Sequence, residues 1–500
     1  MRATEETTSV AIVGAGFGGI GLGIRLQQAG IESFTILEKA DGVGGVWRDN
    51  TYPGLTCDIP SHLYSFSFEP NHEWSRRFPR QPEILDYLER CVDKHRLRGR
   101  LRLGTEVTSA RFDAETGRWR LELAGGDAIE ANVLVTATGQ LSRPAYPSIP
   151  GLRHFGGKLF HSARWDHGYH LAGKRVGVVG TGATAIQIVP EIAPRVERLD
   201  LFQRSAPWVV PKPDRAYRPR ERALYRRLPW LQALSRLRVH LLYELLSLGF
   251  AGRRWIHRPL ELGYERSLRR EVADPELRAR LLPDYPLGCK RIVLSNEWLA
   301  TLTRPNVAVV SDPIAEIVPD GIAMESGELR ELDAIILATG FASRDFLAPM
   351  AVTGIDGADL NAAWRDGAEA YLGLAVAGFP NMFMLYGPNS NLGTGSIVYM
   401  LESQIRYVVG AVLELQRTGA RYLDVHRDVH ASFNAELQRR LAGTVWTAGC
   451  SNWYVTESGK VTNNWPGVAF EYRRRTRRFR IADYRVAHPL IESSAGARSV

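Results

Sequence analysis

The sequence is poor in cysteine. Its four cysteines, Cys57, Cys91, Cys289 and Cys450, are scattered over 500 residues, and no two of them show a Cys-x-x-Cys spacing. This scarcity argues against a zinc site, a thioredoxin-type redox pair and a disulfide framework. It suits a reducing cytosol, so we expect a cytoplasmic protein that binds no metal.

Long apolar runs are also missing. No run approaches the roughly 20 residues that a membrane-spanning helix requires, so we expect no integral membrane segment. Residues 1–9 are polar and acidic and lack the basic and apolar regions of a secretory signal. The hydrophobic fraction of 45% and the charged fraction of 23% are those of an ordinary globular protein. A chain of 500 residues is too long for one hydrophobic core, so several domains are expected.

The formal net charge of +9 raises the question of a nucleic-acid partner. The densest basic cluster, residues 473–480, is short and lies near the C-terminus. We interpret it as a solvated strand or tail, and we expect no nucleic-acid partner. Part of the positive charge is expected to attract anionic phosphates.

A glycine-rich turn follows the first apolar strand pattern, residues 10–13, and leads into a helical pattern. The turn has glycines at Gly14, Gly16 and Gly19. In a strand–turn–helix unit they allow a tight turn, a close approach of the backbone to a pyrophosphate and helix–strand packing. The next strand pattern, residues 33–37, ends at Glu38, which is placed to accept a hydrogen bond from a ribose hydroxyl.

The same order of elements returns further along the chain. Strand patterns at residues 175–179 and 198–202 flank a turn with Gly180, Gly182 and Ala185. The second strand is followed by Arg204 and Ser205, where the first unit has an acid. A guanidinium binds a 2′-phosphate through several donors, whereas a carboxylate repels it. The second unit is therefore predicted to bind NADPH in preference to NADH.

The presence of two dinucleotide-binding units on one chain indicates that electrons pass from one dinucleotide to the other. Two further motifs accompany these units. The segment that joins them has the pattern Phe-x-Gly-x-x-x-His-x-x-x-Trp-Asp, with Phe155, Gly157, His161, Trp165 and Asp166 at its defined positions. A loop at residues 44–58 has the pattern Gly-Gly-x-Trp-x-x-x-x-Tyr-Pro-Gly-x-x-x-Asp. Its glycines, proline and aromatic residues follow no regular period, which predicts an ordered loop that lies against a flat group.

Both motifs resemble those of the type I Baeyer–Villiger monooxygenases, which are class B flavoproteins. The likeness extends from residue 10 to about residue 472 and weakens in residues 212–282. The resemblance implies FAD in the first unit and NADPH in the second. It also implies that one atom of O2 is inserted next to a ketone carbonyl, through a C4a-peroxyflavin, to give an ester or lactone.

The resemblance assigns roles to individual residues. It implies that Arg291 is the catalytic arginine, that Asp58 orients it, and that Lys290 assists in binding the 2′-phosphate. We expect His161 to act in the linker structure and not as an acid or base. The remaining residues expected at the cofactors are Gly45, Trp47, Tyr52, Tyr64, Gln140, Gly340 and Trp453.

The order of the motifs predicts an α/β fold with two Rossmann-like dinucleotide-binding domains and a helical insertion. Residues 1–143 and 341–500 are assigned to the FAD-binding domain. Residues 144–211 and 283–340 are assigned to the linker and the NADP-binding domain. Residues 212–282 are assigned to the insertion.

The insertion is rich in arginine and has leucines at helical spacing. These are Leu224, Leu228, Leu231, Leu234, Leu237, Leu241, Leu245 and Leu248. One interpretation is a helical cover over the active site, and the other is a basic amphipathic helix on a membrane surface. Because amphipathic helices more often bury their apolar stripe in protein, we expect the cover.

Other functions are compatible with parts of this pattern. A flavin monooxygenase that oxidises nitrogen or sulfur would use the same cofactors. An NADPH-linked reductase and a flavin-binding regulatory module are more distant, and the ending Trp165-Asp166 argues against both. The expected partners are a small ketone and O2, and the chain is expected to be a monomer or a homodimer.

Overall fold

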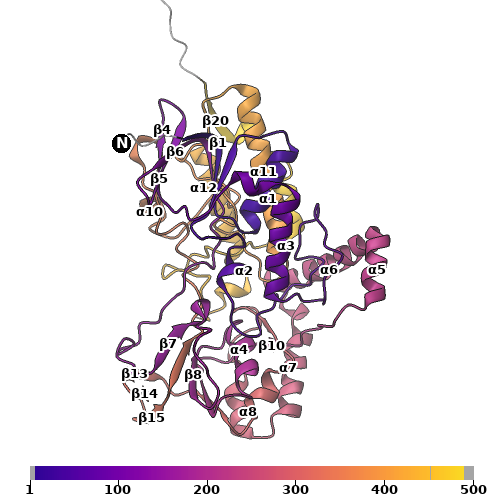
Figure 1. Cartoon of the computed structure of the whole chain (residues 1–500), viewed down its shortest axis with the longest axis vertical. Coiled ribbons are helices and arrows are strands. Elements are labelled where there is room, and N and C mark those ends of the chain that lie inside the picture. The colour runs from indigo at the N-terminus through magenta and orange to yellow at the C-terminus, as the bar shows by residue number, and fades with distance from the viewer. Residues whose placement is uncertain (1–5, 451, 489–500) are drawn as a thin grey trace, which may run out of the picture.

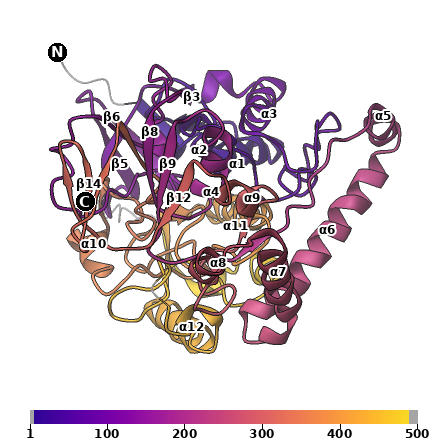
Figure 2. The same cartoon turned by 90° about the horizontal axis from the view of Figure 1, so that it is seen from below.

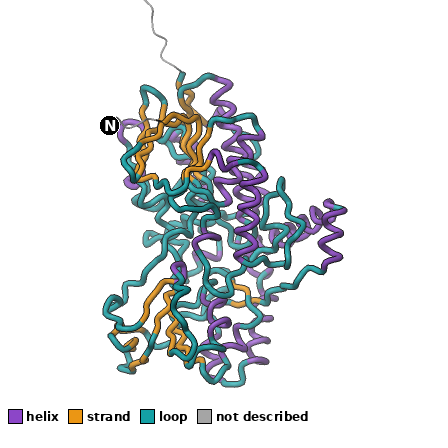
Figure 3. The backbone as a smooth tube through the Cα atoms, in the orientation of Figure 1, coloured by secondary structure: helices purple, strands orange, loops and turns teal. Residues whose placement is uncertain are grey.

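The chain folds into two lobes, one above the other in Figure 1. The computed structural model describes residues 6–450 and 452–488. The upper lobe contains an eight-stranded sheet built from strands before residue 143 and after residue 340, and the lower lobe contains a five-stranded sheet built from strands between them. Figure 3 shows that each lobe contains a sheet with helices beside it. The predicted α/β fold class is confirmed, whereas the domain boundaries stay a prediction.

The upper lobe is organised around an eight-stranded sheet. Its strands are β1 (Glu6–Val13), β2 (Phe34–Leu37), β3 (Leu101–Arg102), β4 (Val107–Asp113), β5 (Arg118–Leu123), β6 (Ala128–Thr136), β17 (Ala351–Thr353) and β18 (Met382–Met384). They lie in the order β17-β4-β5-β6-β1-β2-β3, with β18 paired to β6. Strand β1 is parallel to both β2 and β6, and its Val10, Ala11 and Ile12 are fully buried. A run that is apolar on both faces suits such a central parallel strand.

The lower lobe has a five-stranded sheet that is parallel throughout. Its strands are β7 (Lys158–His161), β8 (Arg175–Val179), β9 (Arg198–Phe202), β12 (Val307–Val310) and β16 (Ala334–Leu337). The order is β12-β9-β8-β16-β7, so the strand that contains part of the linker motif is at an edge. The predicted strands at 175–179 and 198–202 have these bounds in the structure.

Three small sheets complete the strands. They contain β10 (Val209–Val210) with β11 (Val293–Leu294), β13 (Ile314–Val318) with β14 (Gly321–Met324) and β15 (Leu329–Glu331), and β19 (Tyr422–Val425) with β20 (Tyr484–Ala487). Strands β10 and β11 are parallel and connect the end of the second dinucleotide unit to the segment just after Arg291.

Helices cover the sheets and build the side of the molecule. The upper lobe has α1 (Phe17–Gln28), α2 (Val46–Asp49), α3 (Gln81–Lys94), α10 (Leu360–Ala363), α11 (Ile397–Thr418), α12 (Arg427–Leu441) and α13 (Ala469–Arg475). The lower lobe has α4 (Ala185–Ile192), α7 (Arg258–Glu271), α8 (Pro275–Leu281) and α9 (Trp298–Leu302). The insertion helices α5 (Pro219–Arg227) and α6 (Pro229–Phe250) lie at the side of the molecule, where α6 contacts the upper lobe. No helix in the part of the chain that the structure describes is long and apolar enough to cross a bilayer.

Two expectations about basic segments are wrong. Most leucines of the predicted stripe are not buried, because α6 packs on the protein through another side, which includes Gln232, Arg236 and Phe250. Those that are exposed are Leu224, Leu228, Leu234, Leu237, Leu241 and Leu245. The basic cluster at 473–480 is not a solvated strand or tail, because α13 begins before it and anchors it through the fully buried Tyr472 and Thr476.

Two chain segments cross side by side between the lobes. The Ala145 N–H donates to the Gly340 carbonyl oxygen at 2.9 Å, and the Ala342 N–H donates to the Arg143 carbonyl oxygen at 2.9 Å. The Thr339 hydroxyl donates to the Ala145 carbonyl oxygen at 2.6 Å. The two crossings are therefore joined to each other by a short antiparallel ladder.

Candidate active site

A cavity of about 1480 Å³ is lined by residues of both lobes. Ligand pockets typically have volumes of about 300–1000 Å³, so this cavity has room for more than one drug-sized group. Most residues predicted to contact a cofactor line it. They are Gly14, Gly16, Glu38, Gly45, Trp47, Tyr52, Asp58, Tyr64, Gln140, Gly180, Gly182, Arg204, Ser205, Lys290, Arg291, Gly340 and Trp453.

The two glycine turns have the same backbone construction. Gly14 has a φ of +109°, and a Cβ there would lie 2.6 Å from the carbonyl oxygen of Ala137. Gly180 has a φ of +111°, and a Cβ there would lie 2.6 Å from the carbonyl oxygen of Ala338. Each alanine begins an Ala-Thr-Gly segment just after a neighbouring strand, so the repeated tripeptide has the same place in both units. A side chain would close both turns, so these positions require glycine.

Two of the predicted turn residues do not line the cavity. Gly19 packs against the preceding turn, where a Cβ would lie 1.9 Å from the carbonyl oxygen of Gly14. Ala185 is fully buried at the start of α4. The structure therefore places both residues in helix–strand packing, away from the space available to a ligand.

Glu38 lies buried at the end of β2, beside the first turn. Its carboxylate accepts hydrogen bonds from the Ala15 N–H at 2.9 Å and the Ala40 N–H at 3.1 Å. The guanidinium of Arg48 lies 3.3 Å from the same carboxylate. A carboxylate has about four acceptor positions, so acceptor capacity remains toward the cavity. This donor and acceptor set fits the ribose of a dinucleotide at the first turn.

A cluster of cations lies beside the second turn. The Lys290 ammonium donates to the Ser205 hydroxyl at 2.7 Å and lies 4.5 Å from the centre of the Tyr285 ring. Burial and the neighbouring Arg204 guanidinium both lower the pKa of Lys290. Arg204 itself is exposed and also lines the cavity. Two cations and a hydroxyl at one cavity wall fit a phosphate group.

Arg291 and Asp58 form an ion pair between the lobes. The two side chains are 35% and 28% exposed, and both line the cavity. Burial raises the pKa of Asp58, but the charge and hydrogen bond of Arg291 together with the charge of Lys212 outweigh burial and hold that pKa below its ordinary value. The Asp58 carboxylate in turn raises the pKa of Arg291. The pair is therefore a carboxylate and a guanidinium at neutral pH.

Lys212 is a second cation beside Asp58. Its ammonium donates to the Thr56 hydroxyl and lies 5.2 Å from the centre of the Phe78 ring. Burial lowers the pKa of Lys212, whereas Cys57 and Asp58 raise it. Sequence reasoning missed this residue because no motif contains it.

Aromatic and amide side chains build the remaining wall on the upper-lobe side. The Trp47 indole N–H donates to the Tyr64 hydroxyl at 3.1 Å. Burial raises the pKa of Tyr52 and of Tyr64. The Gln140 amide donates to the Tyr386 carbonyl oxygen at 2.9 Å. These side chains are held in place by the protein and present flat or amide groups to the cavity.

The linker motif lies outside the cavity lining. His161 is buried at the end of β7, where its Nδ1 accepts a hydrogen bond from the Ala163 N–H at 3.1 Å. Burial lowers the pKa of His161. Asp166 pairs with Lys158 at 2.5 Å, and this contact lowers the pKa of Asp166. Trp165 packs edge-on against Phe160 beside the same strand.

The two other defined positions of the linker motif are Phe155 and Gly157. A Cβ on Gly157 would lie 2.6 Å from the carbonyl oxygen of Asp333 and 2.7 Å from the Phe155 ring. The absence of a side chain on Gly157 therefore lets the start of β7 pack closely against the residue that precedes β16.

A contact just after the motif joins the linker to the loop at 44–58. The Thr51 hydroxyl lies 2.8 Å from the His167 ring nitrogen.

The helical insertion also supplies part of the cavity wall. Tyr243, Leu246 and Phe250 of α6 line the cavity, together with His257 and Leu260. Burial raises the pKa of Tyr243. These residues were not predicted individually, because an arginine-rich helix with many leucines gives no signal of which face meets a ligand.

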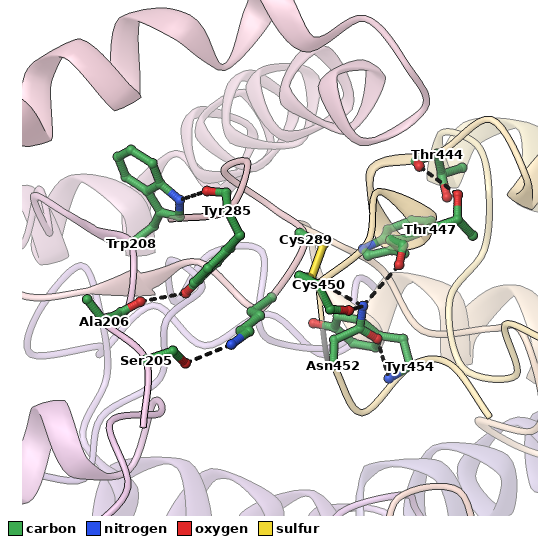
Figure 4. Close-up of a disulfide and its surroundings, with 12 residues drawn as sticks. Ser205, Ala206, Trp208, Tyr285, Cys289, Thr444, Thr447, Cys450, Asn452 and Tyr454 are labelled. Carbon is green, nitrogen blue, oxygen red and sulfur yellow. Dashed lines mark hydrogen bonds between the residues drawn. A yellow bond between two sulfur atoms is a disulfide. The ribbon is translucent and has the colours of Figure 1, made fainter. Parts of the chain in front are cut away.

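A disulfide joins the two lobes near the ion pair (Figure 4). Cys289 and Cys450 are 161 residues apart in the sequence. The expectation that the cysteines form no disulfide is therefore wrong for this pair, because separation along the chain carries no information about proximity in the fold. Cys57 and Cys91 are free and buried.

The disulfide connects two segments that are each held by other contacts. In the lower lobe, the Trp208 indole donates to the Tyr285 carbonyl oxygen at 2.7 Å, and the Tyr285 hydroxyl donates to the Ala206 carbonyl oxygen at 2.8 Å. In the upper lobe, the Tyr454 N–H donates to the Asn452 side chain at 2.9 Å. Figure 4 shows the disulfide between these two groups of residues. It thus ties the segment of Arg291 to the loop that contains Trp453.

Fold and cavity together define a protein that holds two dinucleotides between two lobes. In agreement, residues 11–228 match the family described as pyridine nucleotide-disulphide oxidoreductase. A Baeyer–Villiger monooxygenase of Pseudomonas aeruginosa is 46% identical over 499 residues, which cover 99% of this chain and 95% of that protein. One of Streptomyces coelicolor is 46% identical over 502 residues, which cover 99% and 95%.

Solved structures give the same result. An oxidised steroid monooxygenase bound to NADP superposes with a TM-score of 0.86 at 31% identity, over 96% of this chain and all of that one. A closed cyclohexanone monooxygenase superposes with a TM-score of 0.85 at 29% identity, over 97% of this chain and all of that one. The chain belongs to the Baeyer–Villiger monooxygenase family.

Proposed function

We propose that this protein is an FAD- and NADPH-dependent Baeyer–Villiger monooxygenase. It converts a ketone, O2, NADPH and a proton into an ester or lactone, NADP+ and water. The observation that carries this proposal is the Asp58–Arg291 ion pair in a cavity lined by both dinucleotide-binding turns. Family membership supports the same reaction.

The residues present fit both cofactors. FAD would be held by the first turn and Glu38, with Trp47 and Gln140 on the same side of the cavity. NADPH would be held by the second turn, with its 2′-phosphate at Arg204 and Lys290. When bound, NADPH supplies two electrons and FAD supplies the activation of O2, chemistry for which amino-acid side chains have no equivalent.

The chain supplies positive charge where negative charge develops. As the ketone is attacked, its carbonyl oxygen gains negative charge, and the Arg291 guanidinium would stabilise that oxygen. Asp58 holds the guanidinium in position and keeps its charge in the partly dry cavity. Because the ion pair already exists before a substrate enters, little reorganisation is needed during the reaction.

The cavity wall also limits the access of water. Tyr243 and Phe250 of α6 and Trp453 of the C-terminal loop line the side formed by the insertion and that loop. A wall of aromatic side chains lowers the local dielectric constant and strengthens the interaction between Arg291 and the carbonyl oxygen. These lining residues support a role of the insertion as part of the active-site cover, although its leucine stripe faces outward.

The proposed reaction is tested by product analysis. Purified FAD-loaded protein is supplied with NADPH, 18O2 and a panel that contains a cyclic ketone, a sulfide and an amine. We expect one 18O atom in a lactone and one NADPH oxidised per lactone formed. Oxidation of only the amine or sulfide would identify a heteroatom-oxidising monooxygenase instead. Formation of hydrogen peroxide with no oxygenated product would contradict both assignments.

Two further properties remain predictions. A monomer or homodimer is expected, and light scattering of the purified protein distinguishes them. A cytoplasmic location was expected partly because no disulfide was expected. Since Cys289 and Cys450 are joined, the cysteines no longer support that location. Fractionation of cells that produce the protein tests the location.

A further inference from the structure

The outward face of α6 carries leucines where a solvent-facing helix normally carries polar side chains. Leu234, Leu237, Leu241 and Leu245 are 46%, 49%, 57% and 52% exposed. They follow one another at intervals of three or four residues, so they form one row along the helix. Leu242 is 49% exposed but also lines the cavity, so it lies at the border of this row and not within it.

The apolar surface continues beyond both ends of the row. Leu224, Leu228 and Trp230 are exposed before it, and Trp255 is exposed after it. Of the fifteen exposed large hydrophobic side chains in the described part of the chain, nine fall within residues 224–255. Single exposed leucines are common, whereas a contiguous group marks an interaction surface. Figure 2 shows α6 along the outer edge of the molecule, away from the two sheets.

The inward face of α6 packs on the protein through Val239, Tyr243 and Phe250 and through polar side chains that make hydrogen bonds. Arg236 donates to the Ser65 carbonyl oxygen at 2.8 Å, and Gln232 donates to the Asn71 carbonyl oxygen at 2.8 Å. The Glu244 carboxylate accepts two hydrogen bonds from backbone N–H groups at the start of α13. Rolling the helix to bury its leucines would break these contacts. The leucines therefore face outward in the folded protein.

The same region is strongly basic. Residues 215–258 contain eleven arginines and two glutamates. Glu221 pairs with Arg215, and Glu244 faces α13, so neither glutamate lies on the outward row. Exposed arginines border the row at its start, middle and end; they include Arg226, Arg227, Arg238, Arg253 and Arg254. The surface thus combines apolar side chains with positive charge.

We propose that the outward face of α6 docks this protein on an anionic phospholipid bilayer. The leucines enter the boundary between headgroups and acyl chains, and the arginines contact the headgroup phosphates. Trp230 and Trp255 suit the same depth, because tryptophan combines an apolar ring with a polar N–H. The 22-residue helix offers a contact about 33 Å long at about 1.5 Å per residue.

A second copy of the chain fits this surface less well. A two-fold dimer would place the outward face of α6 against its own copy. The arginines would then meet arginines, with no acidic side chain on the row to balance them. Arg238 lies within the row itself and would approach its counterpart if the helices paired about their centres. An anionic lipid surface accommodates both the leucines and the arginines.

Vesicle sedimentation tests the docking. FAD-loaded protein is mixed with phosphatidylcholine vesicles that either contain or lack phosphatidylglycerol. We expect binding to the anionic vesicles, weakened about tenfold when salt is raised from about 0.05 M to about 0.5 M. The double variant Leu237→Gln, Leu241→Gln should bind at least about tenfold more weakly, because two exposed leucines lose their apolar contact.

The control is the double variant Leu329→Gln, Leu413→Gln, which changes two leucines away from α6 that are also exposed, at 45% and 42%. It should bind like the unaltered protein. Both variants should keep their flavin content and their NADPH-dependent oxygenation, which shows that they are folded. Absence of vesicle binding, or equal binding by both double variants, would overturn the proposal. So would a dimer in vesicle-free buffer that only the α6 variant dissociates, because the face would then bind a second copy.

Discussion

The two dinucleotide-binding units share a backbone plan and differ in the charge that follows their second strand. Gly14 and Gly180 each approach a carbonyl oxygen of a neighbouring strand end, with the same 2.6 Å available for a Cβ. The second strand leads to the buried Glu38 in one unit and to the exposed Arg204 in the other. We expect the shared backbone to determine where a pyrophosphate fits and the differing side chain to select the group at the ribose.

A second difference lies in the helix that follows each turn. In the first unit, α1 begins two residues before Gly19, and a Cβ at Gly19 would collide with the turn. In the second unit, α4 begins only at Ala185, so a methyl group fits at the corresponding place. The first turn is thus closed more tightly on its helix. The third defined position of the glycine motif, Gly19 or Ala185, is therefore determined by helix packing and gives little information about the ligand.

The largest effect is expected where the two units meet. Arg291→Ala should lower kcat for ester formation by at least about 1000-fold, because the cation that faces the developing charge is lost. FAD content and the rate of flavin reduction by NADPH should change little. Arg291→Lys is the matched variant, since it keeps the charge but loses the planar fork, and it should retain partial activity. Unchanged ester formation in Arg291→Ala would remove this residue from the proposed mechanism.

The next largest effect is expected from Glu38, which belongs to the first unit only. Glu38→Ala should raise the Kd for FAD by about 10- to 100-fold, because a buried charged acceptor for two backbone N–H groups is removed. Flavin fluorescence during titration of the deflavinated protein measures this change. Glu38→Gln keeps one acceptor oxygen, so its Kd for FAD should lie between those of the unaltered protein and Glu38→Ala. If FAD binds Glu38→Ala as tightly as the unaltered protein, the first unit does not hold its ribose through this carboxylate.

The corresponding change in the second unit should affect only one coenzyme. Arg204→Ala should raise KM for NADPH by about 10-fold, with little change for NADH, because only NADPH has the 2′-phosphate. Steady-state rates with both coenzymes measure the ratio. Arg195→Ala is the control, because this arginine is exposed in the same lobe and does not line the cavity. An equal loss with NADPH and NADH would contradict the phosphate assignment.

A smaller effect follows from the charge state of Asp58. Arg291 holds the pKa of Asp58 below its ordinary value in the folded protein. The resulting stabilisation is present above the ordinary pKa of about 4 and is lost as pH falls through the lower folded value. The difference in Tm between the unaltered protein and Asp58→Asn should therefore shrink as pH is lowered from about 7 to about 3. A difference that does not vary with pH would contradict an ionised Asp58.

The smallest effect concerns the bond that joins the lobes. Cys450→Ser should lower Tm by about 2–4 °C, because the unfolded chain gains freedom when the cross-link is lost. A dithiol reductant should lower the Tm of the unaltered protein by a similar amount and leave that of Cys450→Ser unchanged. If the reductant shifts both proteins equally, its effect does not arise from this disulfide.

Local patterns were sufficient for much of the fold. The strands at 175–179 and 198–202 were predicted with their observed bounds, because each is a short segment rich in Val, Leu or Phe that ends at a glycine turn or a polar residue. The two turns and their acid or arginine could also be read from the sequence. In these units the residues that define the site are neighbours in the chain, so their spacing carries the information.

Long-range features could not be read in this way. Cys289 and Cys450 are 161 residues apart, and no spacing indicates that they meet. The pairing of Arg291 with Asp58 spans 233 residues and was expected only from the family motif. The orientation of α6 depends on polar contacts such as that of Arg236 with Ser65, which compete with the burial of leucines. These outcomes depend on which segments become neighbours after folding.

The ladder between the two crossing segments has a mechanical consequence. A single connecting strand would let one lobe swivel about several axes, whereas two strands bonded through Ala145 and Gly340 resist twisting about their own direction. Because the Cys289–Cys450 disulfide also joins the lobes, any opening of the cavity would be limited to a small hinge-like rotation about this ladder. Such a one-axis movement would bring the walls of the cavity back to the same relative position in every catalytic cycle.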